Sequence, residues 1–227
     1  MAIKKLIKLI INPYQSFCRV ICLCRSLILT RLYVDKGKGK IVIQSPFLKV
    51  KIKKAKGAIF ELNENLSIGS WLKGLTPVNI CLSTNAKFVL NGSFSIGNGV
   101  TISISKDAEL IIGGKEEESS SGITCNTLIM VYKRIEIGKD FICAWDVTIT
   151  DSDWHKIIGQ EHSSPVFIGN HVWVAHNSSI LKGSYIGNNS IIASHSKVTN
   201  KRFPDNVLVV GTQGKIAKEN ILWQRDI

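Results

Sequence analysis

The sequence has few acidic residues where its basic residues are densest. Residues 1–60 carry fourteen Lys and Arg against one acid, Asp35, whereas residues 61–227 carry fifteen against sixteen. The two parts have net charges of +13 and −1, which account for the +12 of the chain. No recognisable groove-reading motif accompanies the basic part, so we expect no nucleic-acid partner.

The sequence also lacks paired cysteines. Its six cysteines form no C-x-x-C pair and no cluster with histidine. This pattern predicts a reduced protein of the cytoplasm without a metal site. At 227 residues and 44% apolar content the chain is long enough for a sizeable core, which excludes a disordered tail and a small disulfide-stapled domain.

Long uncharged apolar runs are absent from the N-terminal part. A helical stripe in residues 2–11 is followed by Pro13, and the apolar stretch 17–34 is interrupted by Arg19, Arg25 and Arg31. A membrane-spanning helix needs roughly 20 mostly uncharged residues, and no small-residue cleavage site of a signal peptide follows. We therefore expect residues 1–34 to be a basic amphipathic helical segment. It either lies peripherally on the anionic inner face of a membrane or packs in the protein or its oligomer.

A six-residue period is the strongest pattern that is present. Every sixth position from 168 is β-branched, the following position is mostly small, and a serine column accompanies them. The β-branched column consists of Ile168, Val174, Ile180, Ile186, Ile192 and Val198. A period of six suits a short strand and a turn repeated around a solenoid.

Three hexads make one triangular coil, so residues eighteen apart are expected to stack, such as Ile168 beneath Ile186. We predict an all-β solenoid, a parallel β-helix, over residues 35–200. External loops are expected near 115–121 and 156–167, where the register breaks. We assign residues 201–227 to a C-terminal tail with a short helix, which covers the open end of the coils.

The segments IEIGKDFICAWDVTITDSDWH (135–155) and PVFIGNHVWVAHNSSILKGSYIGNNSIIASHSKVT (165–199) resemble the hexapeptide-repeat acyltransferases. The nearest branch is the sugar and polysaccharide O-acetyltransferases, relatives of maltose and galactoside acetyltransferases. The resemblance implies a left-handed β-helix, acetyl-CoA as co-substrate, a sugar or cell-surface glycan acceptor, and a homotrimer with active sites between subunits. It implies no metal.

A histidine begins the second external loop. In a strand, Asp151, Asp153 and His155 alternate onto one face, so either carboxylate is a candidate to orient the imidazole. A hydroxyl acceptor needs a base, because it is a poor nucleophile until it loses its proton. The resemblance places the catalytic base at His155.

The resemblance also suggests residues that bind the two substrates. Trp173 lies in a VW motif that lines the acceptor and donor cleft of the family. Further acceptor candidates are Trp145, Asp146 and Asn126, although Asn126 is equally suited to a turn. The donor candidates are Trp173, His176, Ser194, Thr199 and Lys201. The segment GTQGK departs from the family's usual G-x-P-A-K, which leaves the acyl-chain preference open.

Three other functions compete with this interpretation. One is a zinc enzyme similar to γ-carbonic anhydrase, using His171 and His176, but no third histidine lies near Ile135. Another is a non-catalytic β-solenoid that serves as a scaffold or binding module. The last keeps the fold and donor but acylates an amino group of a nucleotide sugar, or serine.

Overall fold

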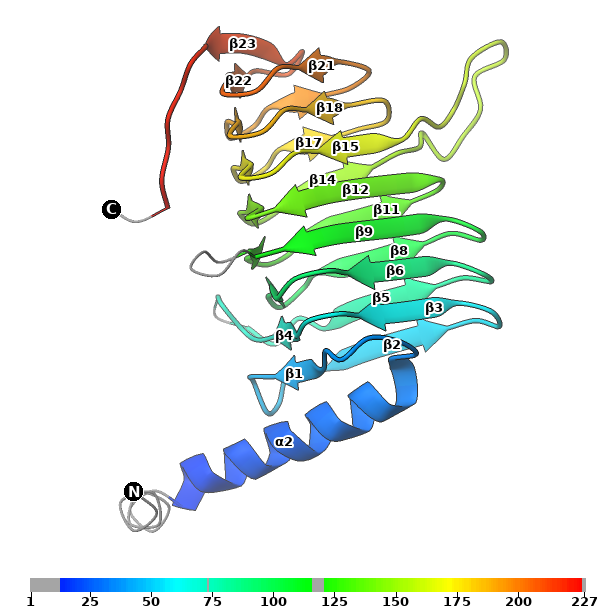
Figure 1. The fold of residues 1–227 in the computed structure, drawn as a ribbon, viewed down its shortest axis with the longest axis vertical. Helices are drawn as coiled ribbons and strands as arrows, with labels where there is room; N and C mark the ends of the chain where they lie inside the picture. Colours follow the sequence, from blue (N-terminus) through cyan, green and yellow to red (C-terminus); the bar gives the residue numbers. More distant parts are fainter. Residues whose placement is uncertain (1–12, 73, 116–120, 226–227) are drawn as a thin grey trace.

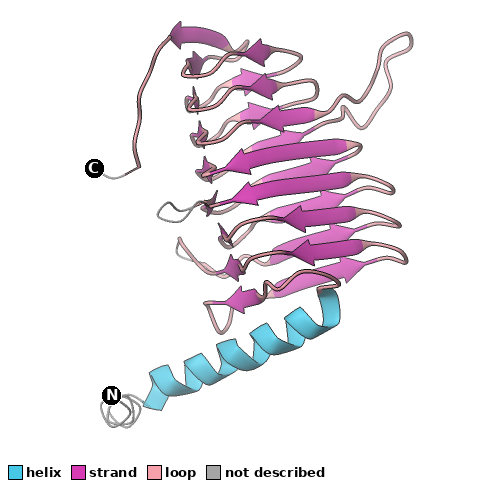
Figure 2. Cartoon of the chain, viewed as in Figure 1, coloured by secondary structure: helices cyan, strands magenta, loops and turns pink. Residues whose placement is uncertain are grey.

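The chain forms a three-sided stack of parallel strands with one helix beneath it, as Figures 1 and 2 show. The computed structural model describes residues 13–72, 74–115 and 121–225. The helical stripe predicted in residues 2–11 lies outside the described residues, as does most of the loop predicted at 115–121. The predicted β-helix is confirmed.

Each side of the stack is one sheet, and the chain visits the three sheets in turn. Sheet 1 contains β1 (Ile41–Ile43), β4 (Leu66–Ile68), β7 (Phe94–Ile96), β10 (Gly122–Ile123), β13 (Ile142–Cys143), β16 (Trp173–Val174), β19 (Ile191–Ile192), β22 (Leu208–Val210) and β23 (Lys215–Lys218). Sheet 2 contains β2 (Val50–Lys54), β5 (Val78–Leu82), β8 (Thr101–Ile104), β11 (Leu128–Val131), β14 (Thr148–Thr150), β17 (Ser179–Ile180) and β20 (Lys197–Val198). Sheet 3 contains β3 (Ile59–Leu62), β6 (Lys87–Leu90), β9 (Glu109–Gly114), β12 (Arg134–Lys139), β15 (Val166–Ile168), β18 (Tyr185–Ile186) and β21 (Arg202–Phe203).

The predicted stacking of residues eighteen apart is confirmed in the later coils. Strand pairing places Ile168 beside Ile186, and the next two pairs of the β-branched column follow the same rule. These side chains fill the interior of the triangle and are fully or almost fully buried. The burial also raises the pKa of the Cys143 thiol to about 12, because a thiolate in this interior would have no solvation.

Turns at the corners use residues that tolerate a left-handed backbone. At the corner between sheets 1 and 2, Asn126 and Asp146 have φ of 48° and 58°, and Asn177 and His195 above them have 55° and 57°. Asn and Asp adopt this conformation more readily than other residues with a side chain. Asn126 and Asp146 thus have a structural reason to occupy these positions.

The coils extend further than the hexad pattern predicts. Strands β21 and β22 continue sheets 3 and 1 beyond residue 200, with Phe203 and Val209 buried. The spacing there is seventeen residues instead of eighteen, since Ile186 pairs with Phe203, and this single deletion hides the repeat. The predicted boundary at residue 200 is therefore too early.

The predicted C-terminal helix is wrong. Gly211 and Gly214, with φ of 84° and 50°, turn the chain back, and β23 pairs antiparallel with β22. The edge of sheet 1 is thus covered by a strand. From β23 the tail runs back along the stack (Figure 1), and Trp223 stacks on His171 with ring centroids 4.0 Å apart.

Helix α2 (Pro13–Tyr33) crosses the other end of the stack. Its side chains bind the outermost strand: the N–H groups of Ile41 and Ile43 donate to Thr30 Oγ1 and Ser26 Oγ, at 3.0 and 2.8 Å. The guanidinium of Arg25 donates to the carbonyl oxygens of Pro46 and Leu48, at 2.5 and 2.6 Å. The helix therefore satisfies backbone groups that a sheet edge leaves unpaired. Among the described residues, no helix has the length and apolar character of a membrane span.

Candidate functional site

The loop with His155 leaves the stack at the corner between sheets 2 and 3. It runs from residue 151 to 165, between β14 and β15, and projects away from the coils in Figure 1. Val166 and Phe167 belong to β15, so the predicted range of 156–167 began and ended too late. The difference arises because the first residues of the loop make polar contacts that hexad spacing does not show.

The base of the loop is a short antiparallel ladder. Ser152 and Ser163 form a bridge, the Asp153 N–H donates to His162 O at 2.8 Å, and the Ser164 N–H donates to Asp151 O at 2.9 Å. The ladder holds the two ends of the loop together. The exposed segment beyond it includes His155.

Asp151 anchors this ladder to the coil below. Its side chain is completely buried, and its carboxylate accepts the N–H groups of Tyr132, Lys133 and Arg134 at 2.6–2.7 Å. Three charge-assisted hydrogen bonds leave the carboxylate committed to the turn between β11 and β12. Asp151 is thus a positioning residue of the loop.

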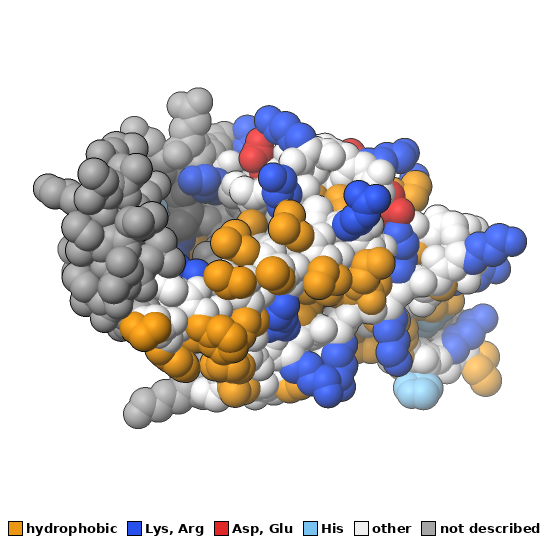
Figure 3. All heavy atoms as spheres, turned by 90° about the horizontal axis from the view of Figure 1, so that it is seen from below, with side chains coloured by type: hydrophobic (Ala, Val, Ile, Leu, Met, Phe, Trp, Pro, Cys, Tyr) orange, Lys and Arg blue, Asp and Glu red, His pale blue; other side chains and the backbone are white. Residues whose placement is uncertain are grey.

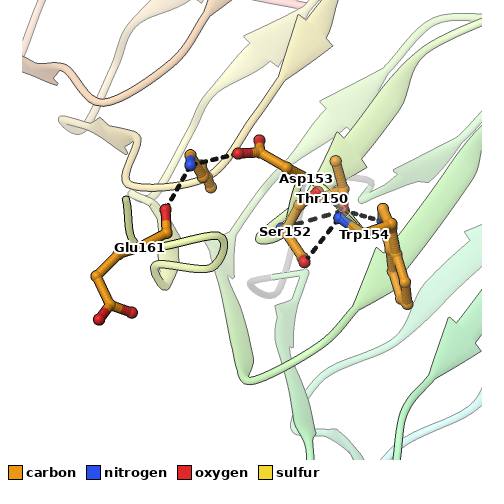
Figure 4. A network of polar contacts seen from close by, with 6 residues as sticks. Thr150, Ser152, Asp153, Trp154 and Glu161 are labelled. Atoms are coloured by element: carbon orange, nitrogen blue, oxygen red, sulfur yellow. Dashed lines mark hydrogen bonds and ion pairs between the residues drawn. The ribbon is translucent and has the colours of Figure 1, made fainter. Parts of the chain in front are cut away.

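Asp153 is held by a residue that the sequence reasoning missed. Lys182, in the next coil, forms an ion pair with Asp153 and donates to Glu161 O at 2.6 Å. Only 9% of Lys182 is exposed. Figure 4 shows Asp153 and Glu161 converging on this ammonium group from the two sides of the loop. The sequence shows only a lysine two residues after Ile180 in the hexad repeat, and its contact with Asp153 depends on the stacking of the coils.

Trp154 fixes the chain just before His155. It has a φ of 62°, its N–H donates to Ser152 Oγ at 3.0 Å, and its indole N–H donates to Thr150 Oγ1 at 3.1 Å, as Figure 4 shows. Its ring also packs edge-on against Tyr132, with centroids 5.9 Å apart. The left-handed Trp154 breaks the strand alternation that was expected to place Asp151, Asp153 and His155 on one face.

That expected alignment is therefore wrong. Within the described part of the chain, neither Asp151 nor Asp153 hydrogen-bonds to His155, because both carboxylates are used by other partners. The His155 side chain is exposed on the projecting arm. It is accessible to a substrate or to a neighbouring subunit.

The predicted substrate-binding residues lie elsewhere. Trp173, 39% exposed, belongs to sheet 1, across the triangle from the corner that carries the His155 loop. Trp145 and His176 occupy successive coils at the corner between sheets 1 and 2, and their rings stack with centroids 5.1 Å apart. His195 continues this column, 5.3 Å from His176. One face and the adjoining corner thus present an exposed aromatic surface.

The remaining donor candidates are less coherent. Ser194 and Thr199 are exposed in the last coils, whereas the Lys201 ammonium donates to the carbonyl oxygens of Gln213 and Gly214. Lys201 therefore supports the turn before β23. The histidines considered as zinc ligands occupy two different corners: His171 stacks on Trp223, and His176 stacks on Trp145.

Comparisons with known proteins agree with the fold and with membership of an O-acetyltransferase family. The model described as "Bacterial transferase hexapeptide (six repeats)" matches residues 165–200. A polysialic acid O-acetyltransferase of Neisseria meningitidis is 32% identical over 65% of this chain and 75% of its own length. An uncharacterized 24.8 kDa protein in the cps region of Klebsiella pneumoniae is 29% identical over 92% of this chain and 91% of its own.

Among solved structures, the polysialic acid O-acetyltransferase OatWY superposes with a TM-score of 0.55 at 26% identity, covering 78% of this chain and 89% of its own. The left-handed β-helix that the sequence suggested is consistent with this likeness. The chain belongs to the hexapeptide-repeat O-acetyltransferase family and is an acyltransferase.

Proposed function

We propose that this enzyme transfers an acetyl group from acetyl-CoA to a hydroxyl of a cell-surface polysaccharide or its precursor, with His155 as the general base. The acceptor class follows the relatives, which include the polysialic acid enzyme and a putative lipopolysaccharide biosynthesis O-acetyltransferase, WbbJ of Escherichia coli. The exposed imidazole on an anchored arm supports the role of His155.

The proposed reaction is a direct transfer. His155 takes the hydroxyl proton as the acceptor oxygen attacks the thioester carbonyl, and a backbone N–H stabilises the oxyanion. The C–S bond then breaks, and the CoA thiolate leaves with the proton that His155 had taken. Asp151 and Asp153 act on this step only through the position of the loop.

One observation carries the further proposal that two subunits share each site. The His155 arm projects from the corner between sheets 2 and 3, whereas Trp173 and the Trp145–His176 column lie on sheet 1 and its far corner. A single chain separates them by the width of the stack. In a homotrimer, the arm of one subunit can meet the aromatic surface of the next.

The first test is His155→Ala, with Lys156→Ala on the same exposed arm as the matched control. We expect acetyl-CoA consumption with a polysaccharide acceptor to fall 10²–10⁴-fold for His155→Ala, the usual contribution of a general base. Lys156→Ala should stay near wild type. Transfer near the wild-type rate by a folded, assembled His155→Ala enzyme would refute the assignment.

Subunit mixing tests the shared site. His155→Ala and Trp173→Ala chains are expected to be nearly inactive separately. When co-expressed, they should recover part of the activity, because some interfaces combine an intact His155 with an intact Trp173. Mixed trimers that stay inactive would contradict a shared site.

The cytoplasm is the compartment that we propose. The six cysteines include no C-x-x-C pair and no cluster with histidine, a pattern that favours a reducing environment. The precursors of cell-surface glycans would be met at the inner face of the membrane, to which the basic N-terminal part is suited by its charge.

A further inference from the structure

Helix α2 packs Cys22, Leu29 and Tyr33 against the core but leaves most of its large apolar side chains exposed. Its inward face includes Arg25, Ser26 and Thr30, which bind the backbone of the first coil. Seven large apolar side chains on the same helix are 54–66% exposed: Tyr14, Phe17, Val20, Leu23, Leu27, Ile28 and Leu32. A helix on a globular protein normally buries such residues, so the outer face of α2 is suited to a partner.

This outer face is directed along the axis of the stack. Figure 3, which views the molecule from beneath the helix, shows a band of hydrophobic side chains with Lys and Arg on both of its flanks. Subunits that pack against the sides of the coils would leave an end-on surface of this kind uncovered. The trimer proposed above therefore gives the band no partner.

The basic residues around the band indicate that its partner is anionic. The exposed cations of α2 and the first coil are Arg19, Arg31, Lys36, Lys38, Lys40, Lys49, Lys51, Lys53 and Lys56. Of the three acids in residues 13–64, Asp35 is paired with Lys54 and Glu64 with Lys38, and the third, Glu61, is outnumbered by these cations. A second copy would bring two such cationic ends together, and nucleic acid would leave the apolar band in water. An anionic lipid surface matches both features.

A groove beside the helix adds to this match. It has a volume of about 590 Å³ and is lined by apolar side chains of α2 and β1, among them Leu23, Leu27 and Val42. Arg31, Lys36 and Lys40 also line it. An apolar cleft with a basic rim provides complementary contacts for the apolar and anionic parts of a lipid.

We propose that the outer face of α2 docks this acetyltransferase on anionic membrane lipid, with the axis of the stack directed away from the bilayer. The proposal sharpens the membrane-side location given above, and its test needs no acetyl transfer. The apolar band enters the headgroup region, and the surrounding lysines and arginines contact the lipid phosphates.

The test is co-sedimentation of the full chain with vesicles of phosphatidylglycerol and phosphatidylcholine in equal amounts. We expect binding that weakens at high salt and is lost on pure phosphatidylcholine. Leu23→Ser/Leu27→Ser should lower the partition coefficient roughly tenfold or more. Lys36→Gln/Lys40→Gln should lower it about fivefold for each lysine.

A matched control is Leu222→Ser, which removes a 94% exposed leucine from the C-terminal tail. It should bind vesicles like the wild type. Cys24 is a native probe, because it is exposed on α2. Its alkylation by a water-soluble maleimide, followed by mass spectrometry, should slow at least tenfold when vesicles are present.

Three outcomes would overturn the proposal. The wild type does not bind the anionic vesicles, Leu23→Ser/Leu27→Ser binds as well as Leu222→Ser, or the leucine variant dissolves an oligomer that the wild type forms without lipid. The last outcome would identify a second copy as the partner. Acetyl transfer to a soluble acceptor, measured on the same proteins, reports separately on the proposed function.

Discussion

Helix α2 and the His155 loop are two irregular additions to a regular stack, and they are attached in the same way. The helix uses Arg25, Ser26 and Thr30 to bind backbone groups of the first coil. The loop uses the buried Asp151 to bind backbone N–H groups of the turn before β12. In both, buried or half-buried polar side chains make the attachment, and in the helix they add to the packing of Cys22, Leu29 and Tyr33 against the core.

The two additions differ in what they leave exposed. The helix presents a broad apolar band, whereas the loop presents a titratable imidazole on a narrow arm. The anchors are thus structural and the exposed parts are free for function. This separation predicts that a substitution in the anchor of the helix alters the helix alone, and that a substitution in the anchor of the loop alters the loop alone.

The largest effect is expected for Asp151→Ala. The substitution removes a fully buried carboxylate and leaves three half-buried N–H groups without their acceptor, which should cost about 3–5 kcal/mol of folding free energy. The melting temperature should fall by roughly 10 °C. Acetyl transfer should fall as well, because the ladder that positions the His155 loop is no longer anchored to the coil below. Calorimetry and an acetyl-CoA assay measure the two effects, and a melting temperature unchanged from the wild type would contradict the anchor role.

A smaller effect is expected for Arg25→Ala at the other addition. Loss of its hydrogen bonds to Pro46 and Leu48 should cost about 2 kcal/mol, while transfer to a soluble acceptor stays at the wild-type rate. Arg31→Ala, which removes an exposed arginine from the same helix, is the control and should leave the melting temperature nearly unchanged. If the two variants melt alike, α2 is not held by Arg25.

Lys182→Met should separate position from stability. The substitution removes the buried partner of the ion pair, but the side chain of Asp153 is 40% exposed, so water can solvate the carboxylate that remains. We expect a stability change below about 1 kcal/mol and a fall in kcat of about tenfold, since small misplacements of catalytic groups are costly. Asp153→Asn should lower kcat less, because Glu161 still accepts from Lys182. An unchanged kcat for Lys182→Met would show that the arm is held without it.

At neutral pH the smallest effect, close to zero, is expected in the coil interior, where it tests whether stability is independent of both additions. In the folded state the pKa of the Cys143 thiol is about 12, whereas the pKa of a thiol in the unfolded chain is about 8.5. Stability should therefore be flat below about pH 8.5 and fall above it, by at most about 1.4 kcal/mol per pH unit. Chemical unfolding between pH 8 and 10 measures this. The decline should be weaker in Cys143→Ala, and an equal decline would assign it to other groups.

The coils were predictable because one interaction recurs. A β-branched side chain every six residues needs no long-range information, and the stacking of Ile168 with Ile186 follows from the count alone. The coil after Ile186 could not be predicted from the period, because its step to Phe203 is seventeen residues. One missing residue breaks the six-residue spacing, although the inward side chains are still buried. The C-terminal end was misjudged for a related reason: an open sheet edge requires a cover but does not choose between a helix and the strand β23.

The residues of the candidate site could be predicted from the sequence, but their positions relative to one another could not. The position of His155 at the start of an irregular segment was visible, whereas its relation to Asp151 and Asp153 depended on Trp154 adopting a left-handed backbone. Lys182, which is distant in sequence from the loop, meets Asp153 only because a later coil lies above it. Such contacts come from stacking across coils.

The repeat also sets a length. From β1 to β13, whose coil continues into the His155 loop, sheet 1 takes four strand-to-strand steps of about 4.8 Å each, so the loop is held roughly 20 Å from the level of the first coil. If the helix rests on lipid, the stack fixes the distance between the bilayer surface and the His155 loop. An acceptor sugar tethered to that membrane is then selected by its height, because only units that far along the glycan reach His155.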